Sequence, residues 1–112
     1  MDWKAFMAEV EGNIGVLTKE IPATAKGFGQ MGQAAKKSGV MDEKTKEFIA
    51  LGIAVSTKCD SCIGFHTRSL ARLGATRDEV TEALAMATYM GGGPSYAYSA
   101  KALEAFDQFA QN

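Results

Sequence analysis

Apolar residues recur at steps of three and four along most of the chain, and this spacing restricts the possible folds more than any other feature. Residues spaced in this way line one face of an α-helix. Apolar and polar residues do not alternate over any stretch long enough to indicate β-strands. We therefore predict an all-α fold of about six short helices.

Residues that typically begin or end helices divide the sequence into these six segments. Helix starts are indicated by capping residues, by a proline suited to a first turn, and by a capping box: Asp2, Pro22, Asp42, Cys59 and Thr76-Arg77-Asp78-Glu79. Helix ends are indicated by glycines, which readily adopt the left-handed conformation that closes a helix: Gly39, Gly74 and Gly91-Gly92-Gly93, the last followed by Pro94.

The apolar spacing also predicts which side chains are buried. In the first half of the chain the expected inner faces are Trp3, Phe6, Val10, Ile14 and Leu17, then Ala25, Phe28, Met31 and Ala35, then Phe48, Ile49, Gly52 and Val55. In the second half they are Cys62, His66, Leu70 and Leu73, then Val80, Leu84 and Ala87 with Met90 as a further candidate, then Tyr98, Ala102, Phe106 and Phe109 with Tyr96 and Leu103 beside them. So many large apolar groups on six short helices predict a homo-oligomer, in which some face another subunit. The alternative is that all of them fill one core.

Length and charge exclude several classes of protein. A chain of 112 residues predicts one domain, residues 1–112. A net charge of -1 without a basic patch gives no reason to expect binding to nucleic acid or membrane. Neither a membrane span nor a signal sequence is recognisable, so we expect a cytoplasmic protein.

The candidate chemistry lies between Glu47 and His66, a segment that contains both cysteines and the only histidine. Cys59 and Cys62 have the Cys-x-x-Cys spacing, which brings two sulfurs within reach of a disulfide at the start of a helix. The positive end of the helix dipole favours thiolates there. His66 follows Cys62 by one helical turn, close enough to accept its proton, which makes Cys62 the better candidate for the attacking thiol.

A carboxylate near His66 would orient the imidazole and stabilise its charged form. If the chain turns back near Thr57, Glu47 reaches about the level of His66. Asp42, Glu43 and Asp60 are other carboxylates in the vicinity, and the spacing favours Glu47 over them only slightly.

The arrangement Glu47, Cys59, Cys62 and His66 resembles the signature of the redox branch of the AhpD-like, carboxymuconolactone decarboxylase-like superfamily. The segments SCIGFHTRSLARLGATRDEVTEAL and ALAMATYMGGGP are similar to the two helices that follow the motif in that family. The resemblance extends from about Val40 to Phe109. One departure is Ser61, which stands where full-length AhpD proteins carry a histidine.

The resemblance implies an AhpD-like helical fold, assembly as trimers or hexamers, and an alkylhydroperoxidase or disulfide reductase activity without a bound cofactor. It implies that Cys62 is the nucleophile, that Cys59 is the resolving cysteine, and that His66 and Glu47 relay protons. The substrate would be a hydroperoxide or a disulfide, including that of a peroxiredoxin partner. The reductant would be a thiol, such as a dihydrolipoyl group on a carrier protein.

Other interpretations of the same residues remain open. The oligomer could be a non-enzymatic scaffold that senses redox state through Cys59 and Cys62, or one that binds a metal. Glu47, Cys59, Cys62 and His66 could supply four zinc ligands, although structural zinc sites usually draw on two separated pairs. The cysteines could also be small buried apolar residues with no chemical role.

Overall fold

The computed structural model describes residues 1–111, which form six α-helices and no strand, as predicted. The helices are α1 (Trp3–Glu20), α2 (Pro22–Lys36), α3 (Glu43–Ser56), α4 (Asp60–Arg72), α5 (Arg77–Gly91) and α6 (Gly93–Phe109). The fold is therefore all-α.

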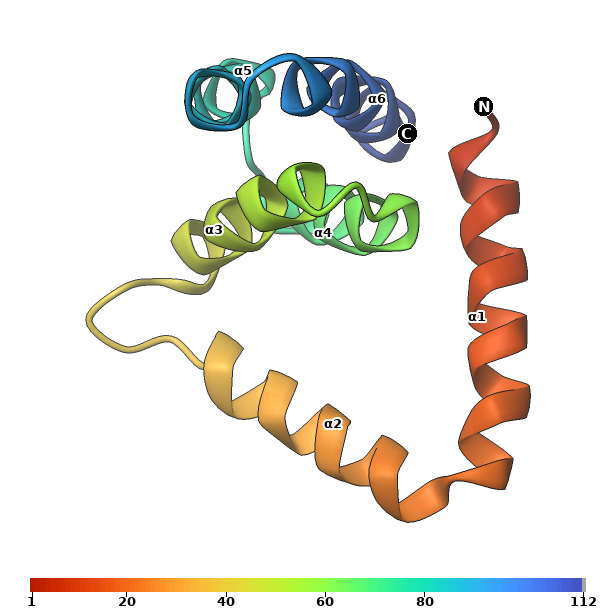
Figure 1. The fold of residues 1–112 in the computed structure, drawn as a ribbon. Helices are drawn as coiled ribbons and strands as arrows, with labels where there is room; N and C mark the ends of the chain where they lie inside the picture. The colour runs from red at the N-terminus through yellow and green to blue at the C-terminus, as the bar shows by residue number, and fades with distance from the viewer. Residues whose placement is uncertain (112) are drawn as a thin grey trace.

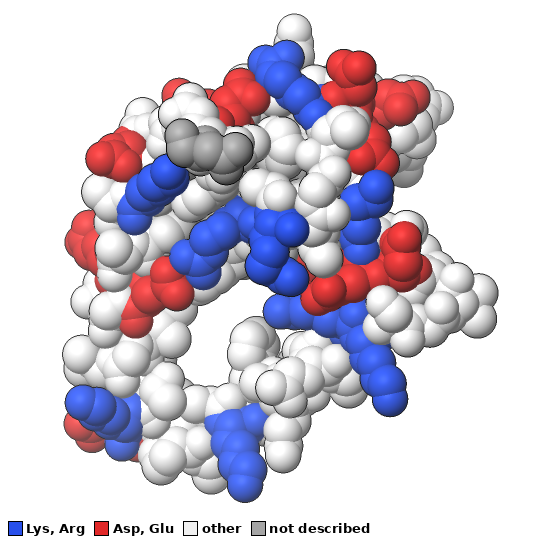
Figure 2. Space-filling view, turned by 180° about the vertical axis from the view of Figure 1, so that it is seen from behind, with Lys and Arg blue, Asp and Glu red and all other residues white. Residues whose placement is uncertain are grey.

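Helices α3 to α6 pack into two layers, with α3 beside α4 and the pair α5 and α6 covering one face of them (Figure 1). Helix α1 contacts α4 and α6 with its N-terminal part and then extends away from them. Helix α2 runs from the end of α1 back toward the start of α3. Helices α1 and α2 thus enclose an open space below the α3–α4 layer (Figure 1). That space is also empty in the space-filling view, where lysine and arginine side chains border it (Figure 2).

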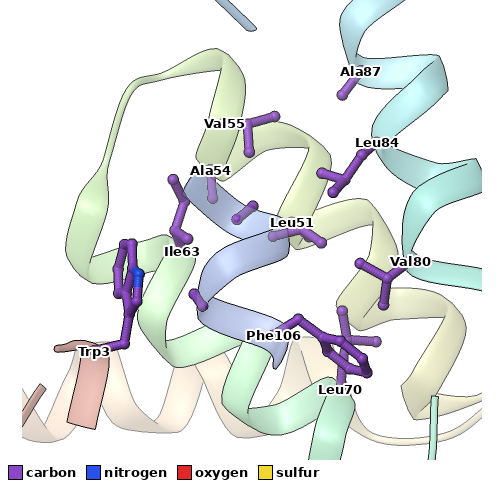
Figure 3. Packing of buried hydrophobic residues seen from close by; sticks show 12 residues of the cluster. Trp3, Leu51, Ala54, Val55, Ile63, Leu70, Val80, Leu84, Ala87 and Phe106 are labelled. Carbon is purple, nitrogen blue, oxygen red and sulfur yellow. The ribbon is translucent and has the colours of Figure 1, made fainter. Parts of the chain in front are cut away.

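The core lies between the two layers (Figure 3). Its buried side chains come from five of the six helices and include Trp3, Leu51, Val55, Ile63, Leu70, Val80, Ala102 and Phe106. Trp3 fixes α1 to this core, because its indole N–H donates to Glu104 Oε1 at 2.9 Å and its backbone N–H donates to Gln108 Oε1 at 2.8 Å. Burying a side chain of this kind stabilises the fold by roughly 1.5–3 kcal/mol.

Most of the predicted helix boundaries are confirmed. Asp2 and Asp42 cap α1 and α3 by accepting from Ala5 and Thr45 N–H, at 3.0 and 2.8 Å. Cys59 caps α4, and Pro22 opens α2. The predicted capping box is present at the start of α5, and Gly74 and Gly92 close their helices with positive φ.

The predicted inner face of α2 is wrong within this chain. No residue of α2 is buried, and Phe28 and Met31 are 71% and 61% exposed. The outer end of α1 is similar, since Ile14 and Leu17 are exposed. Gly39 does not close α2 either: the helix ends at Lys36, and Gly39 has no positive φ. Helical spacing reports an apolar face, but not what covers it.

The inner face of α3 is displaced from the prediction. Val55 is buried, but Ile49 is exposed and Phe48 is only partly covered, while Glu47, Leu51 and Ala54 are buried. Glu47 therefore lies on the buried side of α3, although it is a carboxylate. On α5 the predicted Val80, Leu84 and Ala87 are buried, but Met90 is exposed. On α6 Ala102 and Phe106 are buried and Tyr98 and Phe109 pack at the edge of the core, whereas Tyr96 is exposed.

Helix α1 approaches α4 closely at Gly64, where a Cβ would overlap the buried Met7 side chain. Gly64 lies midway between Cys62 and His66, so this contact fixes α1 against the helix that carries them. Among residues 1–111, no helix is long and apolar enough to cross a membrane.

Candidate active site

The turn between α3 and α4 places the candidate residues. The N–H of Cys59 donates to Ala54 O at 3.1 Å, and the N–H of Lys58 donates to Val55 O at 3.3 Å. This pair of bonds is a Schellman motif, and it requires a left-handed residue at Lys58, whose φ is 56°. The chain therefore reverses within a few residues and α4 returns beside α3, as the proposed position of Glu47 requires.

Cys59 and Cys62 are joined in a disulfide, with their Cα atoms 5.2 Å apart. Both residues are partly exposed. Cys59 is also the N-cap of α4, because its Sγ accepts from the backbone N–H of Cys62 at 3.2 Å. A sulfur that accepts from a helix N-terminus is stabilised as a thiolate once the disulfide is opened. The geometry thus singles out Cys59 as a good leaving thiolate.

Two further polar groups lie around the start of α4. Ser61 Oγ is 3.5 Å from Cys59 Sγ, and because the disulfide has no hydrogen on sulfur, the serine is the donor. Lys101 of α6 pairs with Asp60 Oδ1 at 2.8 Å, and its ammonium also lies 4.9 Å from the centre of the Tyr98 ring. The ion pair ties α6 to the residue that separates Cys59 from Ser61.

Glu47 and His66 form the second half of the site. His66 Nδ1 is 2.5 Å from Glu47 Oε2, across the α3–α4 contact. Glu47 is 1% exposed, whereas the His66 side chain is 24% exposed. Because an ionised carboxylate can only accept, Nδ1 carries the proton, which leaves Nε2 as the nitrogen able to take up another. His66 can therefore act as a base on its exposed side.

The structure thus brings all four candidate residues to one pair of helices. Glu47 is the predicted carboxylate that contacts His66, whereas Asp42, Glu43 and Asp60 each have a different partner. The sequence did not indicate Lys58 or Lys101. Lys58 carries no glycine signal for its left-handed turn, and Lys101 is 41 residues away from Asp60.

In the described part of the chain, neither a metal-binding cluster nor one of the two apolar grooves beside α5 includes the cysteine pair or His66. Within residues 1–111, no three His, Cys, Asp or Glu side chains are grouped so as to hold a metal ion. Two apolar grooves run between α3 and α5 and between α5 and α6, and neither is lined by a cysteine or by His66.

A Cys-x-x-Cys disulfide at a helix start, beside a histidine held by a buried carboxylate, defines a helical protein with a redox-capable dithiol site. The sequence comparison agrees with the fold, because the model of the carboxymuconolactone decarboxylase family matches residues 22–105. The chain belongs to this family. The resemblance inferred from the sequence is thereby confirmed.

Relatives and solved structures resemble the chain over nearly its full length. An uncharacterised protein of Cupriavidus necator is 39% identical over 95% of this chain and 94% of its own, and one of Haemophilus influenzae is 41% identical over 94% and 93%. The crystal structure of a carboxymuconolactone decarboxylase family protein from Legionella pneumophila, in its apo form, has a TM-score of 0.94 at 46% identity and 97% coverage of both chains. A Thermotoga maritima protein of the same family, for which an involvement in antioxidative response is suggested, has a TM-score of 0.81 at 25% identity, over 91% of this chain and 87% of its own.

Proposed function

We propose that the protein is a thiol-dependent oxidoreductase that cycles Cys59 and Cys62 between dithiol and disulfide. The observation that carries the proposal is that α4 holds this disulfide at its start and, one turn beyond Cys62, the His66 that is hydrogen-bonded to the buried Glu47. The antioxidative role suggested for the Thermotoga maritima relative points in the same direction. The substrate is a hydroperoxide or a disulfide, and the reductant is an external thiol, for which a dihydrolipoyl group on a carrier protein is our first candidate.

With a hydroperoxide, His66 accepts the proton of Cys62 and the resulting thiolate attacks the peroxide oxygen. The O–O bond breaks, Cys62 is oxidised to a sulfenic acid, and the alkoxide leaves as an alcohol after taking up a proton. Cys59 then attacks the Cys62 sulfur, which forms the disulfide and releases water. Glu47 holds the imidazole in the tautomer that this transfer needs.

An external dithiol completes the cycle. Its thiolate attacks Cys62 Sγ, and Cys59 leaves as a thiolate that accepts from the Cys62 N–H and faces the Ser61 hydroxyl. The second thiol of the reductant then displaces Cys62, so that the reductant is oxidised to its own disulfide. Because turnover needs a supply of thiols, we place the protein in the cytoplasm.

Turnover tests the proposal directly. Purified protein is supplied with dihydrolipoamide and an alkyl hydroperoxide, and peroxide consumption is followed for the wild type, Cys59→Ser, Cys62→Ser and, as a control, Tyr89→Phe at an exposed position on α5. We expect multiple turnovers for the wild type and the control and none for either cysteine variant. A Cys62→Ser protein that forms a stable mixed disulfide through Cys59 would reverse the assigned roles.

The alternative is a redox-sensing or metal-binding scaffold without turnover. It is distinguished by the reduction potential of the pair, measured by equilibration in thiol redox buffers followed by alkylation and mass spectrometry. A reversible disulfide at roughly -180 to -270 mV, in the range of catalytic dithiols, supports the enzyme. A potential well below about -300 mV together with no turnover would overturn it.

A further inference from the structure

An ion pair between helices α6 and α4 lies at the start of α4. Lys101 Nζ is 2.8 Å from Asp60 Oδ1, and Asp60 is the first residue of the helix that Cys59 caps. The two side chains are 37% and 33% exposed, and ion pairs as exposed as this one contribute little to stability. Stability therefore does not account for a charge pair next to the disulfide.

Lys101 is held in place by two contacts. Its ammonium lies 4.9 Å from the centre of the Tyr98 ring, so a cation–π contact and the ion pair with Asp60 fix the same group. Tyr98 packs against the core, and Ala102, the residue that follows Lys101, is fully buried. The positive charge is thus carried by an anchored side chain on a helix that packs against α4.

Asp60 places a negative charge where the reduced site forms a second one. Cys59 Sγ accepts from the N–H of Cys62, at the positive end of the α4 dipole. When the disulfide opens, Cys59 becomes a thiolate there, and the carboxylate of the next residue in the chain opposes it as a like charge. The ammonium of Lys101 offsets this repulsion.

We propose that Lys101 neutralises Asp60 and thereby favours Cys59 as the leaving thiolate when an external thiol opens the disulfide. The inference rests on the proposed function, because that function assigns this role to Cys59. In the step concerned, the thiolate of the reductant attacks Cys62 Sγ and forms a new S–S bond with it. The Cys59–Cys62 bond breaks, its electron pair stays on Cys59 Sγ, and a thiolate that is more stable leaves faster.

Lys101 is a positioning residue in this scheme, since its ammonium is hydrogen-bonded to the Asp60 carboxylate and not to a reacting sulfur. Its effect is therefore one of charge, and it predicts opposite results for the two members of the pair. Loss of the Lys101 ammonium leaves the Asp60 carboxylate unopposed beside Cys59. Loss of the carboxylate leaves the ammonium free to stabilise the thiolate.

The first test is the rate at which dithiothreitol opens the disulfide at neutral pH, followed by alkylation and mass spectrometry. The variants are Lys101→Met, Asp60→Asn and the double variant. Lys44→Met is the matched control, because the Lys44–Glu79 pair is similarly short, at 3.0 Å, and similarly exposed but joins α3 to α5. We expect Lys101→Met to slow the opening by about two- to threefold, the effect of one charge across several ångströms of partly hydrated protein. Asp60→Asn should speed it by a similar factor, and the double variant and Lys44→Met should stay near the wild type.

The opposite signs distinguish this inference from a merely structural role. If the pair only fixed α6 against α4, both single variants would lose the same contact and would shift the rate in the same direction. Shifts of the same sign, or no shift for Lys101→Met, would overturn the inference. The measurement needs no peroxide, so opposite shifts in a protein without turnover would count against the proposed function alone.

A second measurement assigns the effect to Cys59. In a Cys62→Ser background, the pH midpoint for alkylation of Cys59 by iodoacetamide, an uncharged reagent, reports how readily its thiolate forms. Lys101→Met should move this midpoint to higher pH and Asp60→Asn to lower pH, with circular dichroism to check that each variant keeps its helicity. A midpoint that stays unchanged in both variants would contradict the proposed role of Lys101.

Discussion

Glu47 Oε2 and His66 Nδ1 are hydrogen-bonded at 2.5 Å although 19 residues separate them in the sequence. The bond crosses from α3 to α4 and joins a buried carboxylate to a partly exposed imidazole. A buried charge without a partner is costly, so the pair holds the two helices in register as well as orienting the histidine.

Removing the imidazole should therefore destabilise the protein. We expect His66→Ala to lower the free energy of unfolding by about 3 kcal/mol, because it leaves the Glu47 carboxylate buried and unpaired. The double variant Glu47→Gln, His66→Ala should regain a large part of that loss, since the charge is gone. Urea unfolding followed by Trp3 fluorescence measures both. Equal stability of the single and double variants would show that the imidazole does not compensate the carboxylate.

Ser61 should tune the redox equilibrium of the cysteine pair. Its hydroxyl faces Cys59 Sγ at 3.5 Å and can donate to the thiolate that forms on reduction. A hydrogen bond of about 1 kcal/mol corresponds to about 20 mV for a two-electron couple. We expect Ser61→Ala to make the reduction potential more negative by about that amount. Ser69→Ala on the same helix is the control. An equal shift of the reduction potential in that variant would show that the Ser61 hydroxyl is not responsible.

Lys58 occupies a backbone position that suits glycine. Its φ of 56° lies in the left-handed region, where a side chain costs about 1 kcal/mol relative to glycine. Lys58→Gly should therefore stabilise the protein by about 1 kcal/mol. Gly74→Ala, at the equivalent position after α4 with φ of 78°, should destabilise it by a similar amount. Chemical denaturation compares the two, and a destabilised Lys58→Gly would indicate a contact of the lysine side chain outside this chain.

Acid stability should depend on Glu104. Hydrogen bonds from the N-terminal ammonium and from the Trp3 indole lower the pKa of this carboxyl below its ordinary value of 4.5. A lowered folded-state pKa gives stability that is present above pH 4.5 and is lost as the pH falls below it.

The variant Glu104→Gln keeps an acceptor for the indole but cannot titrate. Its stability should thus fall less steeply below pH 4.5 than that of the wild type, as followed by acid unfolding with Trp3 fluorescence. Glu9→Gln on α1 serves as the control. If Glu104→Gln retained the steep fall of the wild type, the carboxyl would not be the group responsible.

Local signals sufficed for much of the fold. Capping by Asp2, Asp42 and Thr76 and the left-handed glycine at position 74 depend on neighbours within a few residues, and each could be predicted. The spacing of Cys59, Cys62 and His66 likewise placed them on one helix start.

What the sequence could not supply depends on contacts between distant segments. Burial of Glu47 follows from its bond to His66 and from which face of α3 turns toward the core. The large apolar Phe48 and Ile49 led the sequence to predict a different face. The Asp60–Lys101 pair and the left-handed Lys58 have no local signature. The stripe on α2 was recognised correctly as apolar, but its spacing did not reveal that α2 has no buried residue in the described part of the chain.

That bare stripe gives different segments of one polypeptide different local stabilities. Residues 43–109 carry the core together with Trp3, so their amide protons are protected by global folding. Helix α2, Pro22–Lys36, has no buried residue, so its local opening costs little free energy. Hydrogen exchange in α2 should then be much faster than in α3 to α6, so that α2 can unfold and refold while the core that carries the cysteine pair stays folded.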